Sequence, residues 1–132
     1  MKKKLLMFLS ASFILLLTAC SNNTKLYNLT SITQLFEDVE LHLIPQAADT
    51  YPTIMNVQPG VYELLDDLLY VYVFESEDEL IEASKELNVD KVISDSSYVY
   101  QLNNVLMLYI PLSPDHVNFN NQIEDIIANE KD

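Results

Sequence analysis

The sequence predicts an α+β domain: an antiparallel sheet of about five strands with helices on one face, in the order αβ, ββα, ββα. Two observations lead to this class. Residues 61–73 and 99–110 are similar, because each has a short strand, a polar pair and a longer apolar strand. Each of these hairpins is followed by apolar residues at helical spacing. A duplicated ββα unit after an initial helix and strand therefore accounts for most of the chain.

The first helix and the first strand precede this duplication. Ser31 and Gln34 match a capping box, and the helical spacing that follows ends near residue 39. Residues 40–44 alternate in polarity, which is typical of a strand, and Pro45 is expected to end it. Residues 47–58 have no clear period and are expected to form a loop.

Turn residues separate the next elements. Gly60 follows a proline, and this pair predicts a turn in which the glycine can take a positive φ. Residues 66–67 (Asp-Asp) and 103–104 (Asn-Asn) are expected to be the hairpin turns, because such side chains bond the local backbone and tolerate left-handed conformations. Residues 92–93 can extend the strand that ends near residue 102.

The two later helices have recognisable start signals. Ser76, with Glu79 three residues further on, forms a second capping box. Ser113 is followed by Pro114, a residue that is common at the first helical position.

The two long strands are expected to divide their side chains by parity. An aliphatic face would pack against the helices, and its residues are Leu69, Val71, Val73, Leu106, Leu108 and Ile110. The opposite face would carry Tyr70, Tyr72, Phe74, Met107 and Tyr109. Aromatic residues and methionine are enriched in interface cores, so this aromatic face is a candidate binding face for a protein partner. The alternative is that the first helix or the loop 47–58 covers it as part of the core.

Composition excludes several classes of function. The net charge is −13, with 20 acidic and seven basic residues and no arginine, so nucleic-acid binding by clustered cations is excluded. Gly60 is the only glycine, which excludes nucleotide-binding loops and the glycine-flanked serine of many hydrolases. Cys20 is the only cysteine, so no disulfide can form within one chain.

The remaining polar residues suggest no catalytic residue, metal site or cofactor. His42 and His116 lie far apart, and structural roles account for them better than a shared site. The acidic run at residues 75–79 could supply oxygen ligands to Ca²⁺. It suits the positive start of a helix better, because the loop that bends carboxylates around an ion is missing.

The first twenty residues have the pattern of an export signal. Lys2, Lys3 and Lys4 precede an apolar run over residues 5–17, which is shorter than the roughly 20 residues of a membrane span. The closing residues are Leu17, Thr18, Ala19 and Cys20. They resemble the lipobox of bacterial lipoproteins. The resemblance implies that residues 1–19 are removed and that the Cys20 thiol carries a diacylglycerol. Residues 20–27 would then be a tether, and residues 28–132 a single domain.

Residues 62–79 and 98–110 also resemble small, uncharacterised lipoproteins of Bacillus-type bacteria. This resemblance implies an anchored protein that faces outward from the cell membrane, and it implies no activity. The expected function is therefore a non-catalytic binding or adaptor module with a protein partner. A small acid–base hydrolase, or an acidic module that binds a cation or a cationic peptide, is the alternative.

Overall fold

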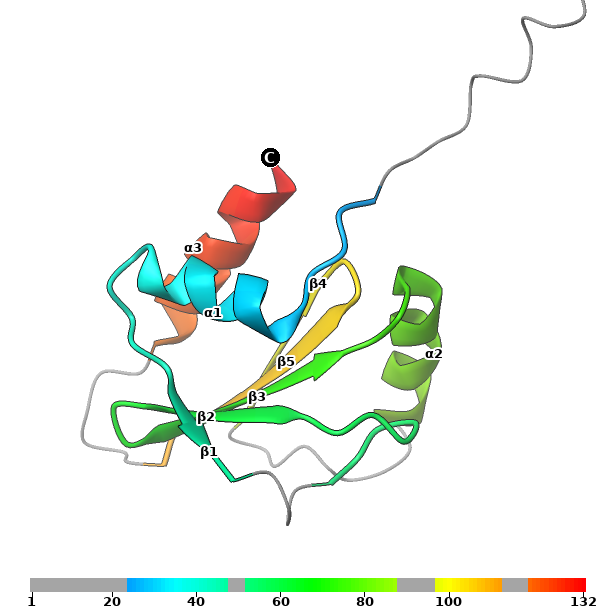
Figure 1. Ribbon diagram of the computed structural model, residues 1–132, viewed down its shortest axis with the longest axis horizontal. Helices are drawn as coiled ribbons and strands as arrows, with labels where there is room; N and C mark the ends of the chain where they lie inside the picture. The colour runs from blue at the N-terminus through cyan, green and yellow to red at the C-terminus, as the bar shows by residue number, and fades with distance from the viewer. Residues whose placement is uncertain (1–23, 48–51, 88–96, 113–118) are drawn as a thin grey trace, which may run out of the picture.

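The computed structural model describes residues 24–47, 52–87, 97–112 and 119–132. In these residues the chain forms a five-stranded antiparallel sheet in the order β1-β2-β3-β5-β4, together with three helices (Figure 1). The predicted α+β class and order of elements are confirmed. The elements are α1 (Leu29–Glu37), β1 (Ile44–Gln46), β2 (Gly60–Leu64), β3 (Asp67–Val73), α2 (Glu77–Leu87), β4 (Tyr98–Leu102), β5 (Val105–Ile110) and α3 (Asn120–Lys131). The expected export signal, the strand extension at 92–93 and the helix start at Ser113 lie outside the described residues.

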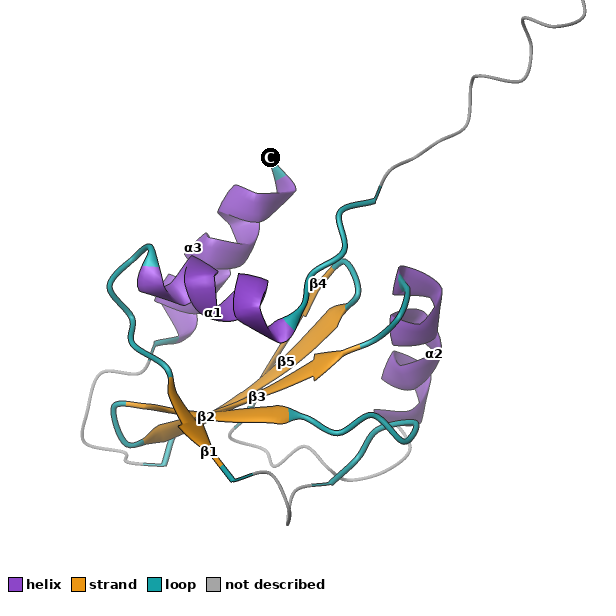
Figure 2. Ribbon diagram, viewed as in Figure 1, coloured by secondary structure: helices purple, strands orange, loops and turns teal. Residues whose placement is uncertain are grey.

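The helices cover both faces of the sheet, which corrects the expectation that they share one face. Helices α1 and α3 lie on one side and α2 lies on the other (Figure 2). The reason is the burial of the central strands. Residues 105–109 of β5 are all buried, so apolar side chains point out of both faces of the sheet and each face needs a cover.

The register between β3 and β5 is opposite in parity to the one expected. Leu69 lies opposite Tyr109, and Val71 lies opposite Met107. Side chains alternate between faces along a strand, so a change of one residue in register exchanges the partners of every side chain. Each face of the sheet therefore mixes aliphatic and aromatic residues, and the uniformly aliphatic face does not form.

Several element boundaries also differ from the expectation. Asn28, not Ser31, caps α1: its side chain accepts a hydrogen bond from the Ser31 N–H, and the Ser31 side chain accepts one in return. The strand expected at 40–44 begins at residue 44, because Glu40 takes a left-handed φ of 62° in the turn that ends α1. Strand β1 contains Pro45, as an edge strand can.

The glycine and the first hairpin turn have other roles than expected. Gly60 has no positive φ; it begins β2, and a Cβ there would lie 2.8 Å from the Leu29 Cδ2 atom. The first turn consists of Leu65 and Asp66, both with positive φ, as a type I′ hairpin turn requires. Asp67 instead begins β3 and is fully buried.

A buried amide holds the start of the domain against the sheet. The Asn104 side chain is 2% exposed, and its Nδ2 donates to the carbonyl oxygens of Tyr27 and Phe74 at 2.9 and 2.8 Å. Its Oδ1 accepts from the Tyr27 N–H at 2.8 Å. One side chain thus satisfies both backbone groups of Tyr27, much as a neighbouring strand would.

Polar contacts around this amide fix the path of the chain. The Tyr27 hydroxyl donates to Glu130 at 2.5 Å, and the Lys25 Nζ lies 2.7 Å from the same carboxylate. Asn103 Nδ2 donates to the Lys25 carbonyl at 2.7 Å. Residues 24–28 therefore lie between the β4–β5 turn and the C-terminal end of α3.

We expect Asn104→Ala to lower the free energy of unfolding by about 3 kcal/mol, because it leaves three buried backbone groups without their partner. Urea denaturation of the purified protein measures this change. The control is Asn103→Gly, which keeps the left-handed backbone at φ 51° and removes one exposed hydrogen bond. It should cost less than about 1 kcal/mol. Equal losses from the two variants would contradict the role given to Asn104.

Candidate functional site

The expected binding face does not form. Its residues lie on two different faces of the sheet, and most are buried: Tyr70, Tyr72, Phe74, Met107 and Tyr109. Tyr72 and Phe74 are buried under α2 and the segment around Ile54, and the Tyr72 hydroxyl donates to the Pro52 carbonyl at 2.8 Å. Met107 and Tyr109 are buried on the opposite face, under α1 and α3. Tyr70 is the one partly exposed member. The alternative interpretation of these residues as core is the correct one for the other four.

The buried carboxylate of Asp67, at the start of β3, bonds to Tyr109 near the end of β5. Asp67 accepts hydrogen bonds from the Tyr109 hydroxyl at 2.5 Å and from the Leu112 N–H at 2.9 Å. The Tyr109 oxygen in turn accepts from the Phe119 N–H at 3.0 Å, and its ring stacks on Tyr98. The bonds from Leu112 and Phe119 tie the chain after β5 and the start of α3 to the sheet, and the bond between Asp67 and Tyr109 joins two strands, so the arrangement has a structural role.

His42, the one histidine in the described part of the chain, lies at the surface. Its ring Nδ1 is 2.7 Å from a Glu37 oxygen, and its side chain is 74% exposed. His116 lies outside the described residues. Of the acidic run at 75–79, Glu79 pairs with Ser76 at the start of α2: its N–H donates to the serine oxygen at 3.2 Å. This is the serine half of the expected capping box; in place of the other half, the Glu79 carboxylate accepts a hydrogen bond from the Glu75 N–H at 3.2 Å.

The described residues contain no group of three or more His, Cys, Asp or Glu side chains able to hold a metal ion. Among them, no helix combines the length and the apolar character that crossing a bilayer requires.

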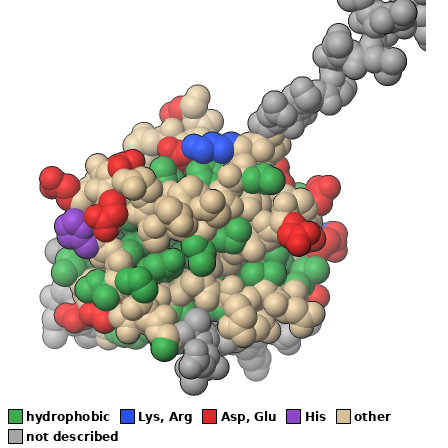
Figure 3. Space-filling model, in the orientation of Figure 1, with side chains coloured by type: hydrophobic (Ala, Val, Ile, Leu, Met, Phe, Trp, Pro, Cys, Tyr) green, Lys and Arg blue, Asp and Glu red, His purple; other side chains and the backbone are tan. Residues whose placement is uncertain are grey.

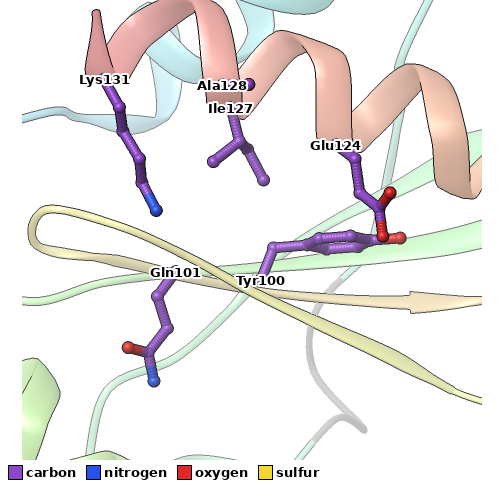
Figure 4. Close-up of a pocket in the computed structure, with 6 residues that line it drawn as sticks. All are labelled: Tyr100, Gln101, Glu124, Ile127, Ala128 and Lys131. Atoms are coloured by element: carbon purple, nitrogen blue, oxygen red, sulfur yellow. The ribbon is translucent and has the colours of Figure 1, made fainter.

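A groove between β4 and α3 is the strongest candidate for a binding site (Figure 4). Its volume is about 320 Å³. It is lined by Tyr100, Gln101, Glu124, Ile127, Ala128 and Lys131. The floor is apolar, and Figure 4 shows Glu124 beside the Tyr100 hydroxyl and Lys131 at the other end, above the strand. A ligand would meet a hydrophobic surface between an acidic and a basic group.

The side chains of this groove are held in place from both elements. The Tyr100 hydroxyl donates to Asn120 at 2.6 Å, and Asn120 begins α3. Burial, and then the charge of Glu124, raise the pKa of Tyr100, so this phenol keeps its proton further into the alkaline range than a free tyrosine does. Gln101 points away from the groove and donates to the Ser84 hydroxyl of α2 at 2.7 Å (Figure 4).

The opposite side of α3 has a second groove of about 330 Å³. It is lined by Val39, Leu41, Gln122, Asp125, Ile126 and Asn129. None of these residues belongs to a strand and none is basic. The groove beside β4 differs because it is bordered by an edge of the sheet and carries both charges.

The surface over α1 has a different character. Figure 3 shows a band of hydrophobic side chains between α1 and the β1–β2 edge, with acidic side chains toward the periphery. Leu29 and Ile44 are exposed hydrophobic residues of these elements.

Comparisons with protein-family models, with curated proteins and with solved structures gave no match to this chain.

Sequence reasoning missed the β4–α3 groove. Glu124 and Lys131 are separated from Tyr100 by more than twenty residues, and each has an ordinary place in a helix or a strand. The available signal was the spacing of Glu124, Ile127, Ala128 and Lys131, which predicts one face of a helix. Nothing in that spacing shows which strand the face lies beside.

The buried tyrosines predict loss of stability in alkali. Burial raises the pKa of Tyr72 to about 12, and it also raises the pKa values of Tyr62, Tyr100 and Tyr109. A raised pKa in the folded state means that the protonated phenol is favoured there. The stability it contributes is complete below the unfolded value of about 10 and is lost as the pH rises through the folded value.

We therefore expect the buried tyrosines to ionise together, in a cooperative step that coincides with unfolding above about pH 10. Phenolate absorbance and circular dichroism, followed through the same titration, measure this. Ionisation of all eight tyrosines near pH 10 with the native dichroism retained would contradict the burial described here.

Proposed function

We propose that the mature protein is a lipid-anchored, non-catalytic binding module on the outer side of the cell membrane. The observation that carries the proposal is the sequence Leu17-Thr18-Ala19-Cys20. It stands directly before a folded domain and ends in the only cysteine of the chain. The thiol would carry a diacylglycerol and the preceding residues would be removed.

The distance between this cysteine and the domain supports a definite orientation. The described chain begins at Thr24, only four residues after Cys20, and an extended chain of that length spans roughly 14 Å. Residues 25 and 27 are bonded to Asn103, Asn104 and Glu130. The β4–β5 turn and the C-terminal end of α3 would therefore face the bilayer.

The charge of the protein is consistent with anchoring by lipid alone. Without Lys2, Lys3 and Lys4 the mature protein would keep four basic and 20 acidic residues, a net charge of about −16, which anionic headgroups repel by about 1 kcal/mol for each charge near the surface. Acyl chains contribute about 0.8 kcal/mol per buried CH₂ and outweigh this repulsion.

Among the described residues, the β4–α3 groove is the part best suited to bind a partner. It offers an apolar floor and two charges, and none of the described residues that line it is a histidine. His42 lies at the surface beside Glu37. In the described residues no observation favours the acid–base hydrolase, so binding is the function proposed.

Growth of the expressing cells with labelled palmitate tests the anchor. The wild-type protein should incorporate the label and sediment with membranes, because the acyl chains are attached at Cys20. Cys20→Ala should do neither. The control Asn22→Ala keeps the cysteine and should behave as wild type. The proposal fails when Cys20→Ala matures normally and stays in the membrane fraction.

A further inference from the structure

Strand β4 forms one edge of the sheet and, among the described residues, pairs only with β5. In the β4–β5 hairpin, Leu102 and Val105 flank a two-residue turn. These two residues therefore exchange backbone hydrogen bonds with each other. The pattern alternates along the strand, and Tyr100 therefore also bonds to β5. The N–H and C=O groups of Val99 and Gln101 point outward from the sheet. They are the groups to which a further strand would bond.

Helix α3 runs beside this edge in the same general direction as β4 (Figure 4). The groove between them is lined by Ile127 and Ala128 from the helix and by Tyr100 from the strand. An added strand would present every second side chain to such a groove. Extended peptides are recognised in this way by other domains: backbone bonds to a sheet edge give affinity, and a neighbouring groove selects side chains.

The two charges of the groove define the peptide further. Glu124 and Lys131 are seven residues apart on α3, which at about 1.5 Å per residue is roughly 10 Å. An extended chain covers that distance in about three residues. Lys131 lies at the end next to the β4–β5 turn, and Glu124 lies at the end next to the Tyr100 hydroxyl (Figure 4).

We propose that an extended peptide adds to β4 in the β4–α3 groove, running parallel to the strand. A basic side chain of the peptide binds Glu124, and the C-terminal carboxylate, three residues further on, binds Lys131. The strongly acidic protein attracts such a basic chain end at long range. The occupant is thus the basic C-terminal end of a partner protein. This inference deepens the proposed binding role, and it does not depend on the lipid anchor.

The test uses the purified full-length protein in a neutral detergent and a labelled seven-residue probe peptide. The probe consists of valine and threonine with one lysine, placed three residues before a free C-terminal carboxylate. Fluorescence anisotropy should show saturable binding. Replacing the peptide lysine by glutamate should weaken binding at least about tenfold, the value of one charge-assisted hydrogen bond. Amidating the C-terminus should weaken it by a smaller but measurable factor.

Protein variants with matched controls locate the site. Glu124→Gln should weaken probe binding about tenfold, and Glu82→Gln, the same change at an exposed residue of α2, should leave it unchanged. Val99→Pro removes an outward N–H, which an edge strand tolerates, and should abolish binding while thermal unfolding remains cooperative.

Three results would overturn the proposal. They are no saturable binding of the probe at millimolar concentration, equal weakening by Glu124→Gln and Glu82→Gln, and unchanged binding by a folded Val99→Pro protein. Because the measurement needs no lipid, palmitate labelling and probe binding can fail independently of each other.

Discussion

The pairing of β3 with β5 is the constraint on which the rest of the structure depends. These two strands are the centre of the sheet, and their register decides which side chains share a face. Since both strands send apolar side chains to both faces, one layer of helices cannot bury them. The chain places α2 on one face and α1 with α3 on the other. Because β3 pairs with β5 at the centre, the other strands of the two hairpins lie outside them, and β1 and β4 are the two edge strands.

The two hairpins show how much of this fold local sequence can predict. The polar pair at 103–104, the cap at Ser76 and the apolar strands follow from turn and helix chemistry within a few residues. The register between the hairpins does not, because it joins residues about forty positions apart and both parities are equally apolar. The error in parity is the reason that the expected aromatic face was wrong.

Asp67 shows the same limit at a single residue. As one of two adjacent aspartates it has the chemistry of a turn, and its neighbour Asp66 does occupy the turn. Its burial follows from the hydroxyl of Tyr109 and the N–H of Leu112, which only the folded sheet brings within reach. The groove beside β4 is of this kind too. Its charges come from a helix whose position over the strand is set by core residues such as Ile123 and Ile126.

The contact of Asn104 with Tyr27 has a mechanical consequence. A pull on the N-terminal segment reaches the domain first at Lys25 and Tyr27, where the chain is held by side chains and not by a sheet ladder. Under load this attachment is expected to yield before any strand separates. Its release would add the five residues 24–28, roughly 17 Å of extended chain, to the free chain between the proposed lipid anchor and the domain. The sheet would stay intact. The N-terminal segment would then extend under a brief force while the domain stays folded.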